Sequence, residues 1–277
     1  MMMHRITGII FFLVAFCGYG WGMEKATSEL DNLVRTFKEN PANPQITIQL
    51  LRELKREGKP AKEVLDRYFQ TQTEADYYKE YNWVIVRDFV NDIRTPQLQY
   101  VFRNRTKFMQ HFSMDDVFQK LDYALVSYLG TFYQKDQTNF HLELKKIREC
   151  GYEHYDVVYD YFYIREIKAA RNAEDYFYKA RKLFRYFPED RQMIKEITNG
   201  ALELIHDVSR LKVIQLWAGK TVESKSDFEA ICNYVTISQR CGFSQVARKY
   251  AMIARNLAEK GDEQMKIQAS RLLQTVN

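Results

Sequence analysis

The chain has 277 residues, a formal net charge of +5 and 46% hydrophobic residues. That length supports one elongated domain with a continuous core, or two ordinary domains. Basic and acidic residues alternate over most of the chain, and the densest basic run, Arg103, Arg105 and Lys107, lies on one predicted helix. A solvated helix face explains this run, so no nucleic-acid partner is expected.

The N-terminus has the layout of a secretory signal peptide. A short basic start precedes the apolar run Ile9–Phe16, and Gly18, Gly20 and Gly22 follow it. This run is too short to span a membrane comfortably. We therefore predict a signal peptide over residues 1–22 with cleavage after Gly22. The mature chain, residues 23–277, is expected in the periplasm or cell envelope without a stable membrane span.

Two alternatives to simple cleavage remain open. The apolar run could be a buried N-terminal helix, which is less favoured because no other part of the chain is so apolar. Cys17 could instead carry a lipid, as in a lipoprotein. Lipidation is disfavoured because the position before that cysteine normally holds a small residue, and Phe16 is bulky.

The mature chain is predicted to be helical throughout, with no alternating β-branched run of strand length. Ser113 is a typical N-cap, and Asp115 and Asp116 follow it in the first turn of a helix. The predicted helices cover residues 24–39, 45–57, a helix opening at Pro60, 77–89, 96–111, 114–134, 138–150, two helices within 152–187 joined at Arg171-Asn172, 190–209, 211–217, 226–240, 244–260 and 262–275.

The stretch 152–187 is the centre of the predicted fold, because it holds twelve of the forty aromatic residues. Its second helix has apolar residues at the three-and-four spacing of one helical face. Its first helix has two stripes, one made of Tyr155, Val158, Tyr159 and Phe162 and the other of Val157, Tyr161 and Ile164. A helix that is apolar on two faces needs neighbours on both sides, so it is expected in the middle of a helical stack.

Short loops between consecutive helices predict antiparallel helical hairpins. Ala247, Ala251 and Ala254 are small residues where the second helix of a tetratricopeptide repeat has them. The match is incomplete, because Tyr161 stands where that repeat prefers glycine and Pro188 comes about one turn late. The predicted fold is therefore all-α, with antiparallel hairpins stacked as a degenerate tetratricopeptide-like solenoid. We expect a single helical-repeat domain over residues 23–277.

Residues 60–125 resemble the helical region attached to some exported thioredoxin-family proteins of Bacteroidota. The residues that carry the resemblance are Tyr68-Phe69, Asn82-Trp83, Phe89-Val90-Asn91-Asp92, Pro96, Gln99-Tyr100, Asn104-Arg105 and Phe108. In that family the redox chemistry belongs to a thioredoxin domain with a CxxC motif. Because this chain has neither, the resemblance does not imply an oxidoreductase activity.

Three cysteines remain after the predicted cleavage: Cys150, Cys232 and Cys241. No two of them form a CxxC pair, which disfavours a zinc or redox site. Cys150 and Cys241 each end a predicted helix and are each followed by glycine and an aromatic residue. Two buried thiols in equivalent turns are favoured over a disulfide between them, and both possibilities stay open.

Motifs for catalysis are weak. The histidines are scattered without an HExxH pair, and no GxSxG motif is present. The stretch Trp217–Thr221 ends like a phosphate-binding loop but has Ile214 where the loop needs glycine. We therefore expect no catalytic residue, no cofactor and no metal site, and a protein that is not an enzyme.

The tyrosine-rich stretch is the remaining candidate for function. Tyr161 and Arg165 are four residues apart on one helix and could offer a partner a ring and a forked donor. These two residues are the expected partner contacts, with Tyr163 in reserve; packing between helices is the structural alternative. The expected function is a non-catalytic, exported helical-repeat module that binds a protein or peptide partner. The alternatives are an accessory to a thioredoxin-like thiol-redox system and a glycan-binding protein.

Overall fold

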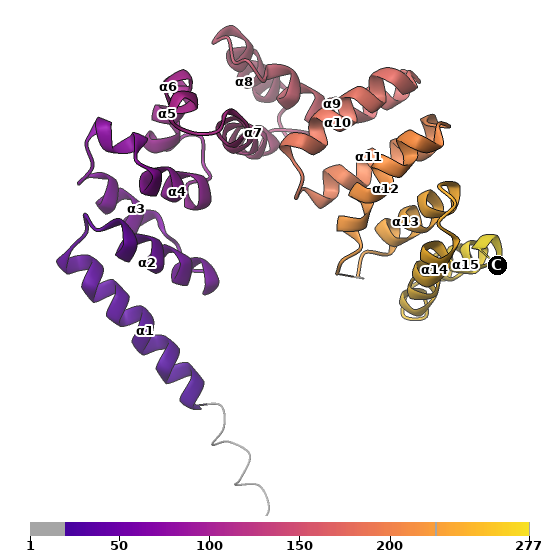
Figure 1. The fold of residues 1–277 in the computed structure, drawn as a ribbon, viewed down its shortest axis with the longest axis horizontal. Helices are drawn as coiled ribbons and strands as arrows, with labels where there is room; N and C mark the ends of the chain where they lie inside the picture. The colour runs from indigo at the N-terminus through magenta and orange to yellow at the C-terminus, as the bar shows by residue number, and fades with distance from the viewer. Residues whose placement is uncertain (1–19, 225, 277) are drawn as a thin grey trace, which may run out of the picture. The chain divides into compact units, whose positions relative to one another are not determined.

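The computed structural model describes residues 20–224 and 226–276 (Figure 1). All regular secondary structure in these residues is helical, which confirms the predicted all-α fold. The chain divides into two compact units, residues 1–104 and 105–277. The expectation of a single domain over residues 23–277 stays a prediction.

The predicted signal peptide is placed only in part. Residues 1–19 lie outside the described residues, and Gly20–Gly22 begin the first helix. Within the described ranges, no helix combines the length and the apolar character that a membrane span requires. Cleavage after Gly22 and lipidation at Cys17 stay predictions.

The described part of the first unit forms five α-helices and one 3-10 helix: α1 (Gly20–Glu39), α2 (Pro44–Arg56), α3 (Lys62–Phe69), η1 (Glu74–Tyr78), α4 (Glu80–Phe89) and α5 (Pro96–Arg103). Helix α2 packs against α1, α3 and α4, and its Leu50 is fully buried. Asn82 of α4 is also fully buried. It accepts a hydrogen bond from the Tyr68 hydroxyl at 2.5 Å and donates one to the Asp76 carbonyl at 2.8 Å. Asn82 therefore connects α3 and η1 to α4.

The second unit contains ten helices: α6 (Arg105–His111), α7 (Met114–Gly130), α8 (Gln137–Glu149), α9 (Tyr155–Ala169), α10 (Ala173–Tyr186), α11 (Arg191–Leu204), α12 (Val208–Thr221), α13 (Phe228–Arg240), α14 (Ser244–Ala258) and α15 (Glu263–Val276). Helix α7 packs against α6, α8, α9 and α10. From α9 onward the helices follow one another through the unit in chain order, from pink through orange to yellow in Figure 1.

A repeating contact pattern relates helices α9 to α15. Each of α9, α11 and α13 packs against the helix that follows it and against the next odd-numbered helix, and each even-numbered helix also packs against the odd-numbered helix after it. We call α9, α11 and α13 the odd row, and α10, α12 and α14 the even row. Stacked helical hairpins produce this pattern. The finer tetratricopeptide-like geometry stays a prediction.

Local capping signals explain where the helices of this array begin. Asp190, Asp207 and Asp227 precede α11, α12 and α13, and each side chain accepts hydrogen bonds from backbone N–H groups of the first turn, at 2.7–3.2 Å. Asn172 does the same for α10 at 3.0 Å. Arg171 before it has φ = 54°, a left-handed conformation that ends α9. The predicted joint at Arg171-Asn172 is confirmed.

Several predicted helix boundaries were wrong. The helix expected over 96–111 is broken at Asn104, whose side-chain amide donates to the Tyr100 carbonyl at 3.0 Å and so competes with the helical backbone. The helix expected to open at Pro60 begins at Lys62. The helix expected over 190–209 ends at Leu204, and the predicted 211–217 helix is longer, because Asp207 caps a helix that starts at Val208.

The C-terminal end of α11 is capped from a distance. Arg240, the last residue of α13, donates from Nη1 to the Leu202 carbonyl at 2.6 Å and from Nη2 to the Ile205 carbonyl at 2.7 Å. Carbonyls at a helix C-terminus have no partner within the helix, and a basic side chain can satisfy them. The two hydrogen bonds therefore join neighbouring hairpins through their backbone ends.

Tyr176 of α10 and Gly200 of α11 approach each other closely between two hairpins. Tyr176 is fully buried, and its hydroxyl points at the carbonyls of Glu196 (3.2 Å) and Ile197 (3.0 Å). A Cβ atom at Gly200 would lie 2.0 Å from that hydroxyl oxygen. Glycine is therefore required here by the space that the tyrosine ring occupies.

We predict that Gly200→Ala destabilises the protein by about 1 kcal/mol or more. Overpacking costs roughly 1–3 kcal/mol, which exceeds the gain of up to about 1 kcal/mol from replacing a helical glycine. Chemical denaturation measures the difference. Gly219→Ala is the matched control, because a Cβ atom there meets nothing closer than 3.7 Å. The control should be neutral or stabilising, and equal stability of the two variants would contradict the assigned contact.

Candidate functional site

Helix α9 is buried on two faces. Val158 and Phe162 of one predicted stripe and Val157 and Ile164 of the other are all buried. The helix packs against α7, α8, α10 and α11. The prediction that this helix lies in the middle of a stack is therefore confirmed.

Tyr161 faces α11. Its hydroxyl donates to Asp190 Oδ2 at 2.7 Å, and its ring centroid lies 4.9 Å from that of Phe187. Burial, followed by the hydrogen bond to Asp190, raises the pKa of Tyr161 well above its ordinary value. Asp190 is the N-cap of α11, so Tyr161 supports the start of that helix. Its role as a partner contact stays a prediction.

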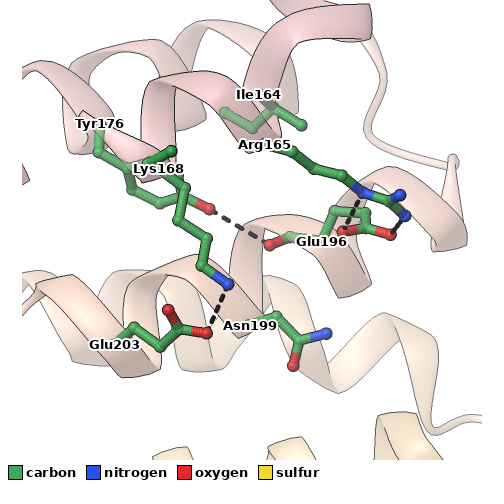
Figure 2. Close-up of a pocket in the computed structure, with 8 residues that line it drawn as sticks. Ile164, Arg165, Lys168, Tyr176, Glu196, Asn199 and Glu203 are labelled. Atoms are coloured by element: carbon green, nitrogen blue, oxygen red, sulfur yellow. Dashed lines mark hydrogen bonds and ion pairs between the residues drawn. The ribbon is translucent and has the colours of Figure 1, made fainter. Parts of the chain in front are cut away.

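Arg165 lies one turn further along α9 and reaches the same neighbour. Its guanidinium forms an ion pair with Glu196 of α11, with Nε at 3.1 Å from Oε2. Another α9 residue, Lys168, forms an ion pair with Glu203 of α11. Figure 2 shows the two basic side chains directed from α9 toward the two carboxylates. Two parallel ion pairs thus bridge α9 and α11.

The space between these bridges is a pocket of about 410 Å³. Its walls carry both charged and apolar atoms: Ile164, Arg165, Lys168 and Ala169 from α9, Tyr176 from α10, and Glu196, Asn199 and Glu203 from α11. We call this space the α9–α11 groove. Because side chains of both signs line it, it could hold a polar or zwitterionic segment whose own charges replace the bridging pairs.

Tyr163 lies on a different side of α9 from Tyr161 and Arg165. Its ring stacks on that of Tyr159, with centroids 4.2 Å apart and an angle of 12° between the planes. Tyr159 is exposed, and Tyr155 lies one turn before it on the same face. The structure therefore brings two of the three predicted contacts, Tyr161 and Arg165, to the boundary with α11, and separates Tyr163 from them.

The ion pair of Arg165 and Glu196 favours the ionised form of both groups. The hydrogen bond from Arg165 lowers the pKa of Glu196, and the same bond raises the pKa of Arg165. Both shifts move the pKa values of these two groups further from neutral pH. A general acid or base needs a pKa near the working pH, so this pair is suited to binding and not to proton transfer.

Polar contacts continue from α11 to α13. Lys195 lies 3.3 Å from Asp227 and 3.0 Å from Glu229, and Asn199 donates to Glu229 at 3.2 Å. A seam of ion pairs therefore runs along the odd row, from α9 through α11 to the start of α13. Structurally, this seam helps to hold the row in register.

The α11 side of the groove was missed at the level of sequence. Glu196, Asn199 and Glu203 are three and four residues apart, so they share one face of α11. The buried residues Ile194, Ile197 and Ala201 occupy the other face. That amphipathic spacing was the available signal, but the acids gave no indication of which helix would lie opposite them.

A second polar cluster lies in the packed region between α7 and α9. Asp122 is fully buried; it accepts from the Tyr152 hydroxyl at 2.7 Å, and His154 Nδ1 lies 3.0 Å from its other oxygen. Burial raises the pKa of Asp122. The His154 ring stacks on Phe118, so this histidine is a satisfied core residue and opens onto no described pocket.

The cysteines are free in the part of the chain that the structure describes. Cys232 and Cys241 are buried and Cys150 is exposed, with its thiol donating to the Ile147 carbonyl at 3.0 Å. Burial raises the pKa of Cys232 to about 12 and also raises that of Cys241. Within the described ranges, no cluster of His, Cys, Asp and Glu could hold a metal ion.

We predict that Arg165→Gln lowers stability in a pH-dependent way. A carboxylate whose pKa is depressed in the fold contributes stability above its unfolded pKa, near 4.5, and loses it as the pH falls through the folded pKa. For this partly exposed pair the cost at pH 7 should be about 0.5 kcal/mol, shrinking to nothing once Glu196 is protonated. Urea unfolding across a pH series measures it.

Arg191→Gln is the control for this titration. Arg191 is exposed and lies 3.7 Å from Glu223, which is also exposed, so its removal should change stability less. A loss of stability in Arg165→Gln that is the same at pH 7 and in acid would show that the ion pair is not its cause.

No protein-family model matches the chain, and no curated protein or solved structure matches it either. The resemblance of residues 60–125 to the helical region of exported thioredoxin-family proteins therefore stays a prediction. The contacts of the described residues carry the functional interpretation by themselves.

Proposed function

We propose that the protein is an exported, non-catalytic helical-repeat module that binds an extended segment of a protein or peptide partner in the α9–α11 groove. The observation that supports this most directly is the pair of parallel ion bridges, Arg165–Glu196 and Lys168–Glu203, on the walls of one pocket. Export is inferred from the signal-peptide layout of residues 1–22.

Each bridge has one member that a partner can reach. The Arg165 side chain is 64% exposed and the Glu203 side chain is 59% exposed, while their partners are more covered. A carboxylate of the partner could bind the guanidinium of Arg165, and an ammonium or amide group of the partner could bind the carboxylate of Glu203. A peptide segment offers both kinds of group along one line, which suits the order of the two bridges along the groove.

The apolar part of the groove supplies contact area between the charges. Ile164 is almost fully buried, and the fully buried Tyr176 forms part of the lining. A bound segment would therefore meet an apolar wall that is already packed, and only the side chains of the two ion bridges would have to change partners. Preorganised surfaces of this kind lose less conformational entropy on binding.

The decisive variant is Arg165→Ala combined with Glu203→Ala. It removes the exposed member of each bridge and leaves the net charge unchanged, so any effect is local. If the groove holds the partner, the variant should bind it at least tenfold more weakly, as loss of central charged contacts usually costs more than about 1.4 kcal/mol. The measurement is quantitative affinity capture from the native cell envelope, with the wild type in parallel.

Glu174→Ala combined with Lys220→Ala is the matched control. Glu174 pairs with Arg210 and Lys220 with Glu189, so this double variant also breaks two ion pairs, one between α10 and α12 and one between α12 and the loop before α11, without changing the net charge. Proteins captured by the wild type and the control, but lost with the groove variant, would support the proposed site. Identical capture profiles for all three proteins would contradict it.

A second expectation concerns the thiols. Replacing Cys150, Cys232 and Cys241 together by Ala or Ser should leave the helical fold and partner capture largely intact. Two of the three thiols are buried with raised pKa values, which makes them poor nucleophiles. Some stability should be lost at the buried positions, measurable by circular dichroism on heating. Loss of capture by a folded triple variant would instead favour the thiol-redox alternative.

A further inference from the structure

The two rows of helices differ in charge. Helices α10, α12 and α14 together carry ten lysines and arginines against two acids. Helices α9, α11 and α13 carry five against six. The even row is therefore strongly basic, whereas the odd row is close to neutral.

The rows also differ in how their cations are paired. In the odd row, Arg165, Lys168, Arg191 and Lys195 all have carboxylate partners, and Arg240 binds backbone carbonyls. In the even row, five cations have no carboxylate partner among the described residues: Arg181, Lys212, Arg248, Lys249 and Arg255. The charge of a cation without a carboxylate partner is not neutralised locally, so the electrostatic field of the even row extends into solvent. This field can attract an anionic partner.

Each even-row helix places an exposed apolar side chain beside one of these cations. Tyr178 (67% exposed) is three residues before Arg181, and Leu216 (73%) is four after Lys212. Met252 (40%) is four after Arg248. These spacings put each pair on one helical face. We call the six residues Tyr178, Arg181, Lys212, Leu216, Arg248 and Met252 the outer face.

The outer face lies opposite the side that each helix buries in the array. Helix α12 buries Leu211, Ile214 and Ala218, and α14 buries an alanine stripe that includes Ala251 and Ala254. Lys212 and Leu216, and likewise Arg248 and Met252, lie on the remaining surface of these helices. A partner could approach them without disturbing the core.

The three helices are also linked to one another in sequence order. Phe184 of α10 stacks on Trp217 of α12, with centroids 4.4 Å apart, and Arg210 of α12 pairs with Glu174 of α10. The Nζ atom of Lys212 in α12 lies 5.9 Å from the ring centroid of Phe243, the N-cap of α14. The basic and apolar pairs therefore recur from one helix to the next along the even row.

We propose that the outer face of the even row docks on an anionic phospholipid surface. The three cations would meet lipid phosphates, while Tyr178, Leu216 and Met252 enter the interfacial region. Electrostatic attraction to anionic lipid combined with a few inserted apolar side chains is a sufficient basis for reversible membrane binding. This surface is separate from the α9–α11 groove, so it would leave that groove available to a partner.

An acidic protein is the competing occupant, and the form of the surface favours lipid. Protein interfaces concentrate their apolar contacts in a central, closely packed cluster. Here each apolar side chain is on a different helix and has a cation beside it. A bilayer interface is fluid and needs no such central cluster, and it accepts dispersed anchors of this kind.

The test is co-flotation of the full chain with lipid vesicles. The wild type should bind vesicles of phosphatidylglycerol and phosphatidylcholine, and bind less as the ionic strength rises. The triple variant R181Q/K212Q/R248Q should lose about tenfold or more of its partition coefficient. Vesicles of phosphatidylcholine alone measure any contribution of the apolar N-terminal segment, which all the proteins share.

The control variant is K145Q/R191Q/K266Q. It removes three exposed cations from α8, α11 and α15, each loosely paired at 3.6–3.9 Å, so the net charge changes by the same amount outside the even row. This control should bind anionic vesicles nearly as well as the wild type. Equal loss in both triple variants would mean a non-specific charge effect and would overturn the proposal.

The apolar contribution is tested with Y178S/L216S/M252S. This variant should bind anionic vesicles several-fold more weakly at physiological ionic strength, because only the electrostatic attraction remains. Unchanged binding, together with displacement of the wild type from vesicles by poly-L-glutamate at low concentration, would assign the surface to acidic polypeptides. No binding of the wild type to anionic vesicles would also overturn the proposal. Neither result bears on capture through Arg165 and Glu203.

Discussion

The burial of α9 on two faces is the constraint on which the second unit depends. A helix of this length has little stability of its own in water, and an apolar surface on both sides cannot be covered by one hairpin partner. Helix α9 is covered by α7 and α8 as well as by α10 and α11. The helical array therefore continues on both sides of α9, and the later helices repeat the contacts that α9 makes with α10 and α11.

The two rows of helices differ in how their charged side chains are paired. In the odd row, charges on one helix meet opposite charges on the next, so the seam is locally neutral and a ligand must exchange partners to bind there. In the even row, the cations are mostly directed to solvent and act over the distance set by ionic screening. The proposed partner groove is therefore locally neutral, whereas the surface proposed for lipid is basic, and the two come from alternate helices of one chain.

Much of the fold follows from local signals in the sequence. Asp and Asn caps mark the starts of α10 to α13, and the left-handed Arg171 marks the joint between α9 and α10. These signals act within a few residues, which is why the helical character of the chain could be predicted. The number of helices was not predicted, because the helix expected over 96–111 is divided into α5 and α6. Boundaries were less certain where a side chain competes with the backbone, as Asn104 does.

The candidate site could be predicted only on one side. The spacing of Tyr161 and Arg165 placed them together, and the structure directs both to α11. The same spacing rule separates Tyr163 from Tyr161, since residues two apart on a helix point in different directions. The partners Asp190 and Glu196 are 29 and 31 residues away, and no local pattern links them to α9. Such pairings depend on which hairpins become neighbours.

The Arg240 guanidinium donates two hydrogen bonds, to the carbonyls of Leu202 and Ile205. These bonds make the preceding hairpin depend on the following one. The last turn of α11 is completed by a residue at the far end of α13, which belongs to the following hairpin. When α13 opens, two partly buried backbone carbonyls of the preceding hairpin lose their donors, so loosening is transmitted toward the N-terminus. The opposite does not hold to the same extent, because α13 takes its own N-terminal cap from Asp227. The cooperativity of these two hairpins is therefore expected to be asymmetric, with the C-terminal end of α11 more dependent on α13 than α13 is on that end of α11.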